Sequence, residues 1–333
     1  MRGLETDHDQ VPQEINPNSA PFSLPTQGVR FLVESQNPDG GWGFHAALSS
    51  ATEPTAWAVM GLDACAGHVE CRQSEEKGFA WLEECQLQDG SWPAHLGQRE
   101  GSWVTSAACL ALASKRCWLI GDPEEALAKG LRWLVKSWPG EGNPWWRLRR
   151  AKLKLRPASR RDSGLRGWGW TPKTSGWVEP TALALLALQA APRELHPKDA
   201  QKRIRLGQAM LLDQALATGG WNSGSSDSYG YAARPQPGPT AWALMALREQ
   251  QHGPEIVAGL DWLCQIHSQV KGFFSFSLVC LCLNLWGVEY GLSHLENAFS
   301  TGSKPISPMA IGWALLAITP PEGPPGPLRA PEI

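Results

Sequence analysis

The segment Lys77-Gly-Phe-Ala-Trp-Leu-Glu-Glu-Cys-Gln-Leu-Gln-Asp-Gly-Ser-Trp92 closely repeats a segment that lies fifty residues earlier, Gln27-Gly-Val-Arg-Phe-Leu-Val-Glu-Ser-Gln-Asn-Pro-Asp-Gly-Gly-Trp42. Each copy reads as the end of a helix, a glutamine, an acidic turn that contains glycine, and a tryptophan. A small, apolar helical segment follows each copy. A fixed period of about fifty residues, with two helices in each unit, is typical of a repeat architecture.

The rest of the chain continues this alternation less regularly and predicts six helical hairpins. The first helices are expected at 29–35, 75–85, 124–137, 200–217, 256–266 and 292–299, and the second helices from 54 and at 104–114, 180–189, 239–249, 274–285 and 308–318. The second helices are apolar nearly all round, so they must be buried on all sides. The first helices carry Lys, Arg and Glu on one face, as an outer layer does. We therefore predict an all-α fold, a single α/α barrel (toroid).

Four of the predicted inner helices begin with proline, at Pro54, Pro180, Pro239 and Pro308. Proline suits the first helical position, where its missing N–H is harmless and its φ is already helical. All inner helices would then run in the same direction, with their N-termini at one mouth of the barrel. Helix N-termini carry partial positive charge and unpaired N–H groups, so we expect a functional site at this mouth.

Length and composition bound the organisation of the chain. Its 333 residues are enough to bury a substantial core. We expect the barrel at 26–318, a disordered segment at 1–25, and a Pro-rich tail at 319–333, because that composition holds neither helix nor sheet. The net charge of −2 creates no global field that would select a polyanionic partner.

The eight cysteines are scattered along the chain. The polar, Pro-containing segment 1–25 has no apolar run of the signal-peptide type, so we expect reduced cysteines and a cytoplasmic protein. Cys280 and Cys282 have no second Cys/His pair at metal-binding spacing, and we expect neither a metal nor a cofactor. The most apolar run, 273–288, is shorter than the ~20 residues of a membrane span and is predicted to be a buried helix.

The Lys-Gly-x2-Trp-Leu-x3-Gln-x3-Gly-x-Trp pattern at 77–92, with its copy ending at Trp42, resembles the QW motif of squalene–hopene and oxidosqualene cyclases. That family shares its α/α barrel with protein prenyltransferase β-subunits. The resemblance covers most of 26–318, although only the first two copies are complete. In those cyclases the motif is structural, since Gln and Trp link adjacent hairpins. The resemblance therefore implies that Trp42 and Trp92 are packing residues.

The resemblance also points to a candidate acid. Class II terpene cyclases carry Asp-x-Asp-Asp-Thr-Ala at the start of an inner helix, where an aspartate protonates an alkene or epoxide. The corresponding segments here are Trp-Val-Glu-Pro-Thr-Ala at 177–182 and Ala-Thr-Glu-Pro-Thr-Ala at 51–56, which place Glu179 and Glu53 at the acid position but lack the flanking aspartates. The alternative is that each glutamate stabilises a helix start, near the N-cap with proline at the first helical position.

Two glycine-rich loops add further candidates at the same mouth. The loop 167–177 brings three tryptophans, and the loop 219–231 adds a second candidate acid, Asp227, which could instead be a turn-forming residue. Aromatic faces stabilise carbocations and line isoprenoid tunnels, but they also stack on sugar rings. The predicted substrate-binding residues of the two loops are Trp168, Trp170, Trp177, Trp221, Asn222 and Tyr229.

A basic insertion interrupts the third hairpin at about 143–166. Within 145–166 it has nine basic residues and one acidic residue, with Trp and Leu between them. Such a segment suits an anionic membrane surface or a diphosphate head group, for which Arg147, Arg149 and Arg150 are the candidates. The alternative is a solvated loop. With no recognised module around it, nucleic acid is not an expected partner.

Three functions remain open from the sequence. The first is an isoprenoid cyclase or transferase-like enzyme that uses a glutamate acid and an apolar cavity. The second is a non-catalytic barrel that binds a polyprenyl lipid or a protein partner, with possible contact to a membrane surface. The third is a carbohydrate-active α/α toroid with a pair of carboxylates.

Overall fold

The computed structural model describes residues 23–65, 69–114, 123–140, 166–224, 227–228, 231–250, 253–288, 290–301 and 307–318. Residues 1–22 of the predicted disordered segment 1–25, the tail 319–333 and most of the basic insertion, 141–165, lie outside these residues.

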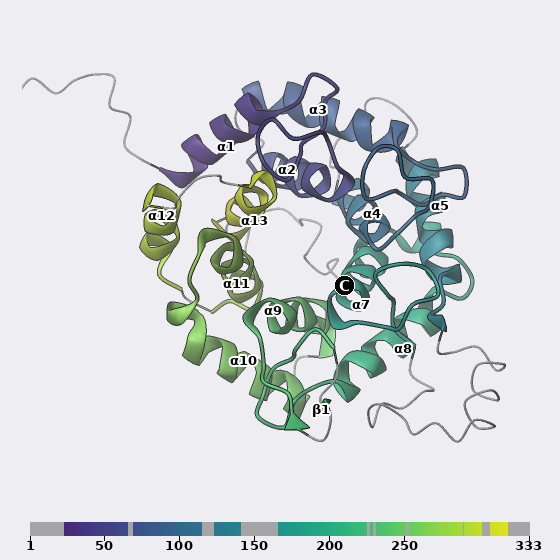
Figure 1. Ribbon diagram of the computed structural model, residues 1–333, viewed down its shortest axis with the longest axis vertical. Coiled ribbons are helices and arrows are strands. Elements are labelled where there is room, and N and C mark those ends of the chain that lie inside the picture. Colours follow the sequence, from purple (N-terminus) through teal and green to yellow (C-terminus); the bar gives the residue numbers. More distant parts are fainter. Residues whose placement is uncertain are drawn as a thin grey trace, which may run out of the picture.

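The described helices form two concentric rings (Figure 1). The outer ring contains α1 (Leu24–Ser35), α3 (Val69–Glu84), α5 (Pro123–Lys136), α8 (Ala200–Asp213), α10 (Pro254–Ile266) and α12 (Leu292–Thr301). The inner ring contains α2 (Thr52–Ala64), α4 (Val104–Ser114), α7 (Val178–Ala190), α9 (Pro237–Ala246), α11 (Phe273–Leu285) and α13 (Pro308–Ile318). Each inner helix packs on the next, and α13 closes the ring against α2. The predicted α/α toroid of six hairpins is confirmed.

The remaining regular structure is small. Short 3-10 turns lie at Arg193–Leu195, Arg248–Gln250 and His267–Gln269. The strands β1 (Asp227–Ser228) and β2 (Tyr231–Ala232) pair antiparallel in the loop before α9. No helix in the described ranges is long and apolar enough to cross a membrane.

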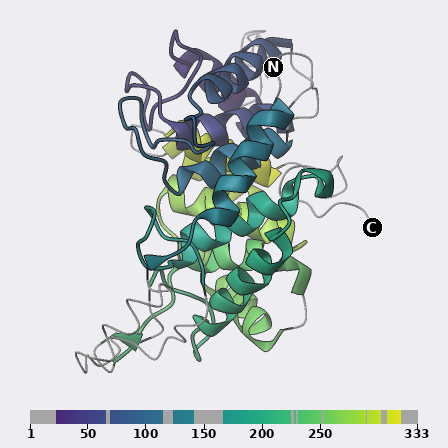
Figure 2. The same ribbon diagram turned by 90° about the vertical axis from the view of Figure 1, so that its right-hand side faces the viewer.

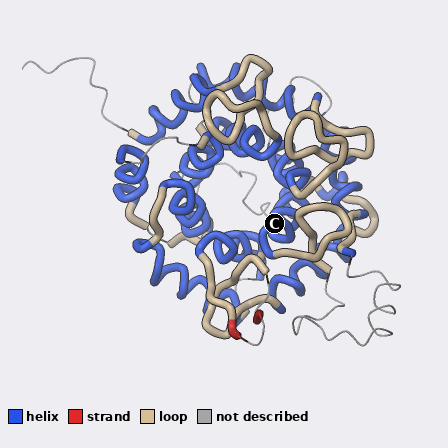
Figure 3. The backbone as a smooth tube through the Cα atoms, viewed as in Figure 1, coloured by secondary structure: helices blue, strands red, loops and turns tan. Residues whose placement is uncertain are grey.

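The loops that lead into the inner helices gather at one end of the toroid (Figures 2 and 3). Because each hairpin runs from an outer helix through such a loop to an inner helix, the inner N-termini share this end, as predicted. The proline prediction was wrong for three of the four helices: α2, α7 and α9 begin two residues before Pro54, Pro180 and Pro239, which are their third residues. The first four helical N–H groups have no partner within the helix, so proline is harmless there too. The first helix also begins earlier than expected, at Leu24, because Pro25 fits its first turn.

A tryptophan interlock connects neighbouring hairpins. The Nε1–H of Trp42 donates to the carbonyl of Leu32 at 2.8 Å, and its backbone N–H donates to Oγ1 of Thr55 at 2.9 Å. Its ring packs on Gly78 of the next outer helix, where an added Cβ would lie 2.7 Å from the indole. Gln36 adds hydrogen bonds across the same boundary, because its Nε2 donates to a carbonyl of α3 as well as to its own turn.

The second hairpin repeats this arrangement. Trp92 donates to the carbonyl of Leu82 and to Oγ1 of Thr105, and its ring packs on Gly130 of α5. Gln86 donates to a carbonyl of α5. Both Trp42 and Trp92 are fully buried, which confirms that they are packing residues.

Candidate functional site

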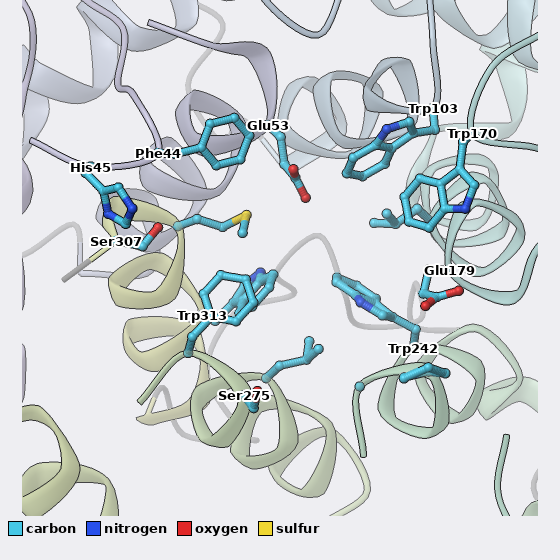
Figure 4. A pocket seen from close by; sticks show the side chains of 16 residues that line it. Phe44, His45, Glu53, Trp103, Trp170, Glu179, Trp242, Ser275, Ser307 and Trp313 are labelled. Atoms are coloured by element: carbon cyan, nitrogen blue, oxygen red, sulfur yellow. The ribbon is translucent and has the colours of Figure 1, made fainter. Parts of the chain in front are cut away.

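A cavity of about 510 Å³ opens at the mouth where the inner helices begin (Figure 4). Side chains of α2, α7, α9, α11 and α13 line it, together with the loops that enter α2, α4 and α7. Its walls are predominantly apolar and aromatic. The aromatic lining residues are Phe44, Trp103, Trp170, Trp242, Phe274 and Trp313.

Three indoles meet below the mouth, and two of them, Trp242 and Trp313, line the cavity. Trp57, Trp242 and Trp313 pack mutually, with ring centroids 5.5 to 5.8 Å apart. Since α2 and α9 are not neighbours in the inner ring, the contact between Trp57 and Trp242 crosses the middle of the toroid. Each of the three is the sixth residue of its helix, so they lie at one level below the mouth. The indole N–H groups of Trp57 and Trp313 are buried and have no hydrogen-bond acceptor within the described residues.

Glu53 enters this cavity from the first turn of α2. Its carboxyl lies between Phe44 and Trp103 and points into the open space (Figure 4). The residue is 8% exposed, and its side chain makes no hydrogen bond or ion pair within the described parts of the chain. Burial raises the pKa of the carboxyl to about 8, because the charged form loses its hydration. Glu53 is therefore mainly protonated at neutral pH.

Glu179 occupies the same place in α7 and lines the same cavity, but its surroundings differ. Its Oε1 accepts a 2.5 Å hydrogen bond from the hydroxyl of Ser223, while its Oε2 is buried and has no partner in the described residues. Burial raises the pKa of Glu179, and hydrogen bonds from Ser223 and from its own backbone oppose that rise. The structure thus brings the two predicted glutamates together at one cavity.

Among the predicted aromatic residues, Trp170 lines the cavity. Its ring meets that of Trp103 edge to face, with centroids 4.9 Å apart, and its carbonyl accepts a hydrogen bond from the backbone N–H of Trp103. The loops before α4 and α7 are joined at this point. Together the two indoles form one wall of the cavity.

Trp168 and Trp221, which the sequence predicts to bind substrate, are not among the residues that line the cavity. Both are buried and repeat the interlock of Trp42: their backbone N–H groups donate to the hydroxyls of Thr181 and Thr240. Their rings pack on the glycines of the next outer helices, Gly207 and Gly259. The spacing of thirteen residues from Trp to Thr, common to Trp42, Trp92 and Trp168, is a signal that could have identified this role.

Trp177 and Asn222 are not among the residues that line the cavity. Trp177 is partly buried, pairs with Trp168 through its backbone N–H, and packs against Gly224. The side chain of Asn222 accepts a hydrogen bond from the backbone of Gly224, which makes it a turn residue. Asp227 lies in β1, but its side chain lies outside what the structure describes. Tyr229, Arg147, Arg149 and Arg150 lie outside the described residues.

Sequence reasoning missed most of the cavity wall. Trp242 and Trp313 belong to helices that are apolar nearly all round, where each tryptophan is equally compatible with the core. Their recurrence at the sixth helical position, shared with Trp57, is the signal that distinguishes them. Phe44 and Trp103 lie in the loops that precede the inner helices of the first two hairpins, and the sequence analysis did not identify either residue.

The polar groups of the cavity are few. Besides Glu53 and Glu179 they are His45, Ser275 and Ser307. No lysine or arginine of the described residues lines the cavity, and no group of three or more His, Cys, Asp or Glu side chains among them is placed to hold a metal ion. The described cysteines are free, and burial raises the pKa of Cys109, Cys280 and Cys282.

Residues 18–103 match the family model of the squalene-hopene cyclase C-terminal domain. Among solved structures, a protein from Actinoplanes is 15% identical with a TM-score of 0.55, over 88% of this chain and 97% of that chain. The GH76A α-1,6-mannanase from a Salegentibacter species is 8% identical with a TM-score of 0.56, over 89% of this chain and 98% of that chain. A variant of the type II terpene cyclase MstE from Scytonema, solved with its product merosterolic acid A, is 16% identical with a TM-score of 0.49, over 88% and 78% of the respective chains. No curated protein matches the sequence significantly.

These identities are low, so the structural likeness concerns the fold. The sequence match covers the first hairpin and the outer helix of the second, where the repeated Gln and Trp pattern is complete. The resemblance to squalene–hopene cyclases inferred from the sequence is confirmed over that part of the chain. The protein is an α/α toroid whose residues 18–103 match the squalene-hopene cyclase C-terminal domain.

Proposed function

We propose that the mouth cavity binds an isoprenoid and that Glu53, rather than Glu179, is the acid of the site. The observation that supports this most strongly is a buried carboxyl, without any hydrogen-bond partner in the described residues, that faces a cavity walled by aromatic rings. The volume of about 510 Å³ lies within the ~300–1,000 Å³ range of small-molecule sites. Apolar walls of this kind suit a hydrocarbon chain.

The composition of the cavity favours this ligand over a carbohydrate. A sugar presents a hydroxyl on nearly every ring carbon, and each buried hydroxyl needs a hydrogen-bond partner. Apart from indole N–H groups, the polar side chains that the described lining offers for that purpose are the two glutamates, His45, Ser275 and Ser307. An isoprenoid has few polar groups, so it leaves few partners unmatched. The aromatic rings would contact its chain and methyl groups.

The proton on Glu53 defines the chemistry that the site can support. A carboxyl whose pKa is raised to about 8 is a weaker acid than an ordinary glutamic acid. Protonation of an isolated alkene requires a much stronger acid, whereas the oxygen of an epoxide is far more basic. We therefore propose that Glu53 donates its proton to an epoxide oxygen as the carbon–oxygen bond breaks. An alkene of the chain forms the new carbon–carbon bond, and transfer of a proton from carbon back to the carboxylate of Glu53 ends the reaction.

Binding without catalysis is the second candidate, and one observation favours it. Glu53 has no neighbouring acid or hydrogen-bond donor in the described residues to stabilise its carboxylate after proton transfer. A carboxylate left alone in an apolar cavity is costly. The residue could therefore serve only as a polar contact for a bound polyprenyl lipid.

Incubation of the purified protein with squalene, squalene epoxide and geranylgeranyl diphosphate, followed by gas chromatography–mass spectrometry, tests the proposal. We expect a cyclic product from the epoxide that is lost in Glu53→Gln and retained in Glu179→Gln, which is the matched control on the same helix position. Product loss in Glu179→Gln alone would overturn the assignment of Glu53. Binding of the epoxide without product would leave the non-catalytic lipid barrel.

A further inference from the structure

Two carboxyl groups line the mouth cavity, and no lysine or arginine among the described residues lines it with them. Glu53 is unpartnered within the described residues, and so is the buried Oε2 of Glu179. Buried carboxyl groups in proteins are normally paired or hydrogen-bonded. We infer that the ligand supplies the missing partner and carries a positive charge, as a tertiary or quaternary ammonium group on an apolar chain. The inference rests on the proposed binding function of the cavity, and not on catalysis.

The aromatic walls are suited to the same charge. Ammonium groups are attracted to the faces of indole rings, and desolvated sites strengthen the attraction. The indoles of Trp103 and Trp170 form one wall, and those of Trp242 and Trp313 form another (Figure 4). The cavity therefore combines π faces with two carboxyl groups, which is the chemistry that recognises an alkylated ammonium ion.

The charges that the described residues direct at the cavity disfavour an anionic ligand. The titratable lining residues among them are His45, Glu53 and Glu179. A diphosphate or another anion would meet two carboxyl groups and no lysine or arginine of the described residues, so it would be repelled whenever either glutamate is ionised. A neutral isoprenoid would avoid repulsion but would bring no charge to the carboxyl of Glu53 or to Oε2 of Glu179. A cation interacts favourably with both carboxyl groups.

Binding of a cation should also change the protonation of Glu53. The carboxyl is mainly protonated at neutral pH because burial disfavours its charge. A positive charge placed beside it favours the ionised form, so the proton leaves when the ligand enters. Cation binding is thus coupled to proton release, while binding of a neutral ligand is not.

Isothermal titration calorimetry at neutral pH with three ligands on the same hydrocarbon chain tests the inference. The probes are geranyltrimethylammonium, geraniol and geranyl phosphate, each titrated in phosphate and in Tris, whose different ionisation enthalpies reveal proton release. We expect the ammonium compound to bind at least about tenfold more tightly than geraniol, with geranyl phosphate weakest. About one proton per site should be released with the ammonium compound alone.

Matched variants of the two glutamates test whether proton release and the preference for the ammonium compound come from Glu53. Glu53→Gln should abolish proton release and reduce the preference for the ammonium compound, whereas Glu179→Gln should retain proton release. Circular dichroism and thermal unfolding of both variants check that they are folded. Equal or tighter binding of geraniol than of the ammonium compound would overturn the inference while the proposed isoprenoid site stands. Absence of binding by all three probes would contradict the proposed function itself.

Discussion

The first turns of the inner helices in the first and third hairpins contain the same tetrapeptide, Glu-Pro-Thr-Ala, yet the two glutamates have different surroundings. Glu53 and Glu179 are each the second residue of an inner helix and line one cavity. Glu53 faces aromatic rings without a hydrogen bond from the described residues, whereas Glu179 accepts one from Ser223. That serine comes from the loop of the following hairpin. The shared tetrapeptide thus places both carboxyl groups at the cavity, and the hydrogen bond from the following hairpin is what distinguishes Glu179 from Glu53.

The same two hairpins also differ in how they bind their neighbours. In the first, Gln36 donates across the boundary to a carbonyl of α3. In the third, Trp138 stands at the glutamine position and Arg203 of α8 donates in the opposite direction, to the carbonyls of Ser137, Arg166 and Gly167.

Arg203 is held between two aromatic rings. Its guanidinium lies 4.2 Å from the ring of Trp138 and 3.7 Å from that of Trp168, and the residue is fully buried. Burial and the nearby Arg166 lower the pKa of Arg203 to about 9. Its acceptors flank 141–165 in sequence on both sides, so one side chain connects the two ends of the basic insertion.

The largest difference between the hairpins should appear in the pH dependence of stability. The pKa of Glu53 is about 8 in the folded state and 4.5 in its ordinary state. Between these two pH values the folded protein keeps a proton on Glu53 that the unfolded chain has released. The stabilisation that this proton gives the folded state is fully present below the unfolded pKa and is lost as the pH rises through the folded pKa. Between about pH 5 and about pH 8, the free energy of unfolding of the wild type should fall by roughly 3 to 4 kcal/mol relative to that of Glu53→Gln.

Urea unfolding of wild type, Glu53→Gln and Glu179→Gln across this pH range measures the effect. The difference for Glu179→Gln should have the same sign but be smaller, because hydrogen bonds oppose the rise in the pKa of Glu179. Parallel curves for wild type and Glu53→Gln would show that Glu53 is not buried as a neutral acid.

Replacement of Arg203 should lower the free energy of unfolding more than replacement of Gln36, although both residues connect neighbouring hairpins. Arg203→Ala would leave buried carbonyls without donors and an empty space between two indoles, at a cost of about 3 kcal/mol. Gln36→Ala should cost about 1 kcal/mol, because its acceptors are only partly buried and water can replace the amide. Free energies of unfolding from urea titrations check both values, with Arg203→Lys as the control that keeps the charge but loses the planar group. A smaller cost for Arg203→Ala than for Gln36→Ala would contradict the role given to Arg203.

The smallest expected effect concerns the environment of Glu179 alone. Ser223→Ala removes the hydrogen bond that stabilises its ionised form, so the pKa of Glu179 should rise further and Glu179 should become more like Glu53. Titration of the side-chain carboxyl by carbon NMR, with glutamate labelled and Glu179→Gln used for assignment, measures the pKa. An unchanged or lowered pKa in Ser223→Ala would show that the serine is not what distinguishes the two glutamates.

The fold was predictable because its packing rules recur along the chain. Tryptophan, the threonine thirteen residues later and the glycine of the next outer helix appear together at Trp42 and Trp92. The shared cavity of Glu53 and Glu179 also followed from the sequence, since both begin inner helices that point their N-termini to one mouth.

The details of the cavity could not be derived in the same way. Trp168 lies in a glycine-rich loop that resembles an open ligand loop, although its ring is buried on Gly207. Trp242 and Trp313 lie on helices buried on every side, and only the closed ring shows which of their faces meets the cavity. The partner of Glu179 is 44 residues away in sequence, beyond the reach of local patterns.

Difference infrared spectroscopy of wild type against Glu53→Gln at neutral pH is the most direct test of the central claim, that a neutral, buried Glu53 faces the ligand cavity. We predict a carbonyl band of a protonated carboxyl that is absent from the variant, and that shifts when geraniol is added and weakens when geranyltrimethylammonium is added. A spectrum without that band, or a band that neither ligand alters, would contradict the claim.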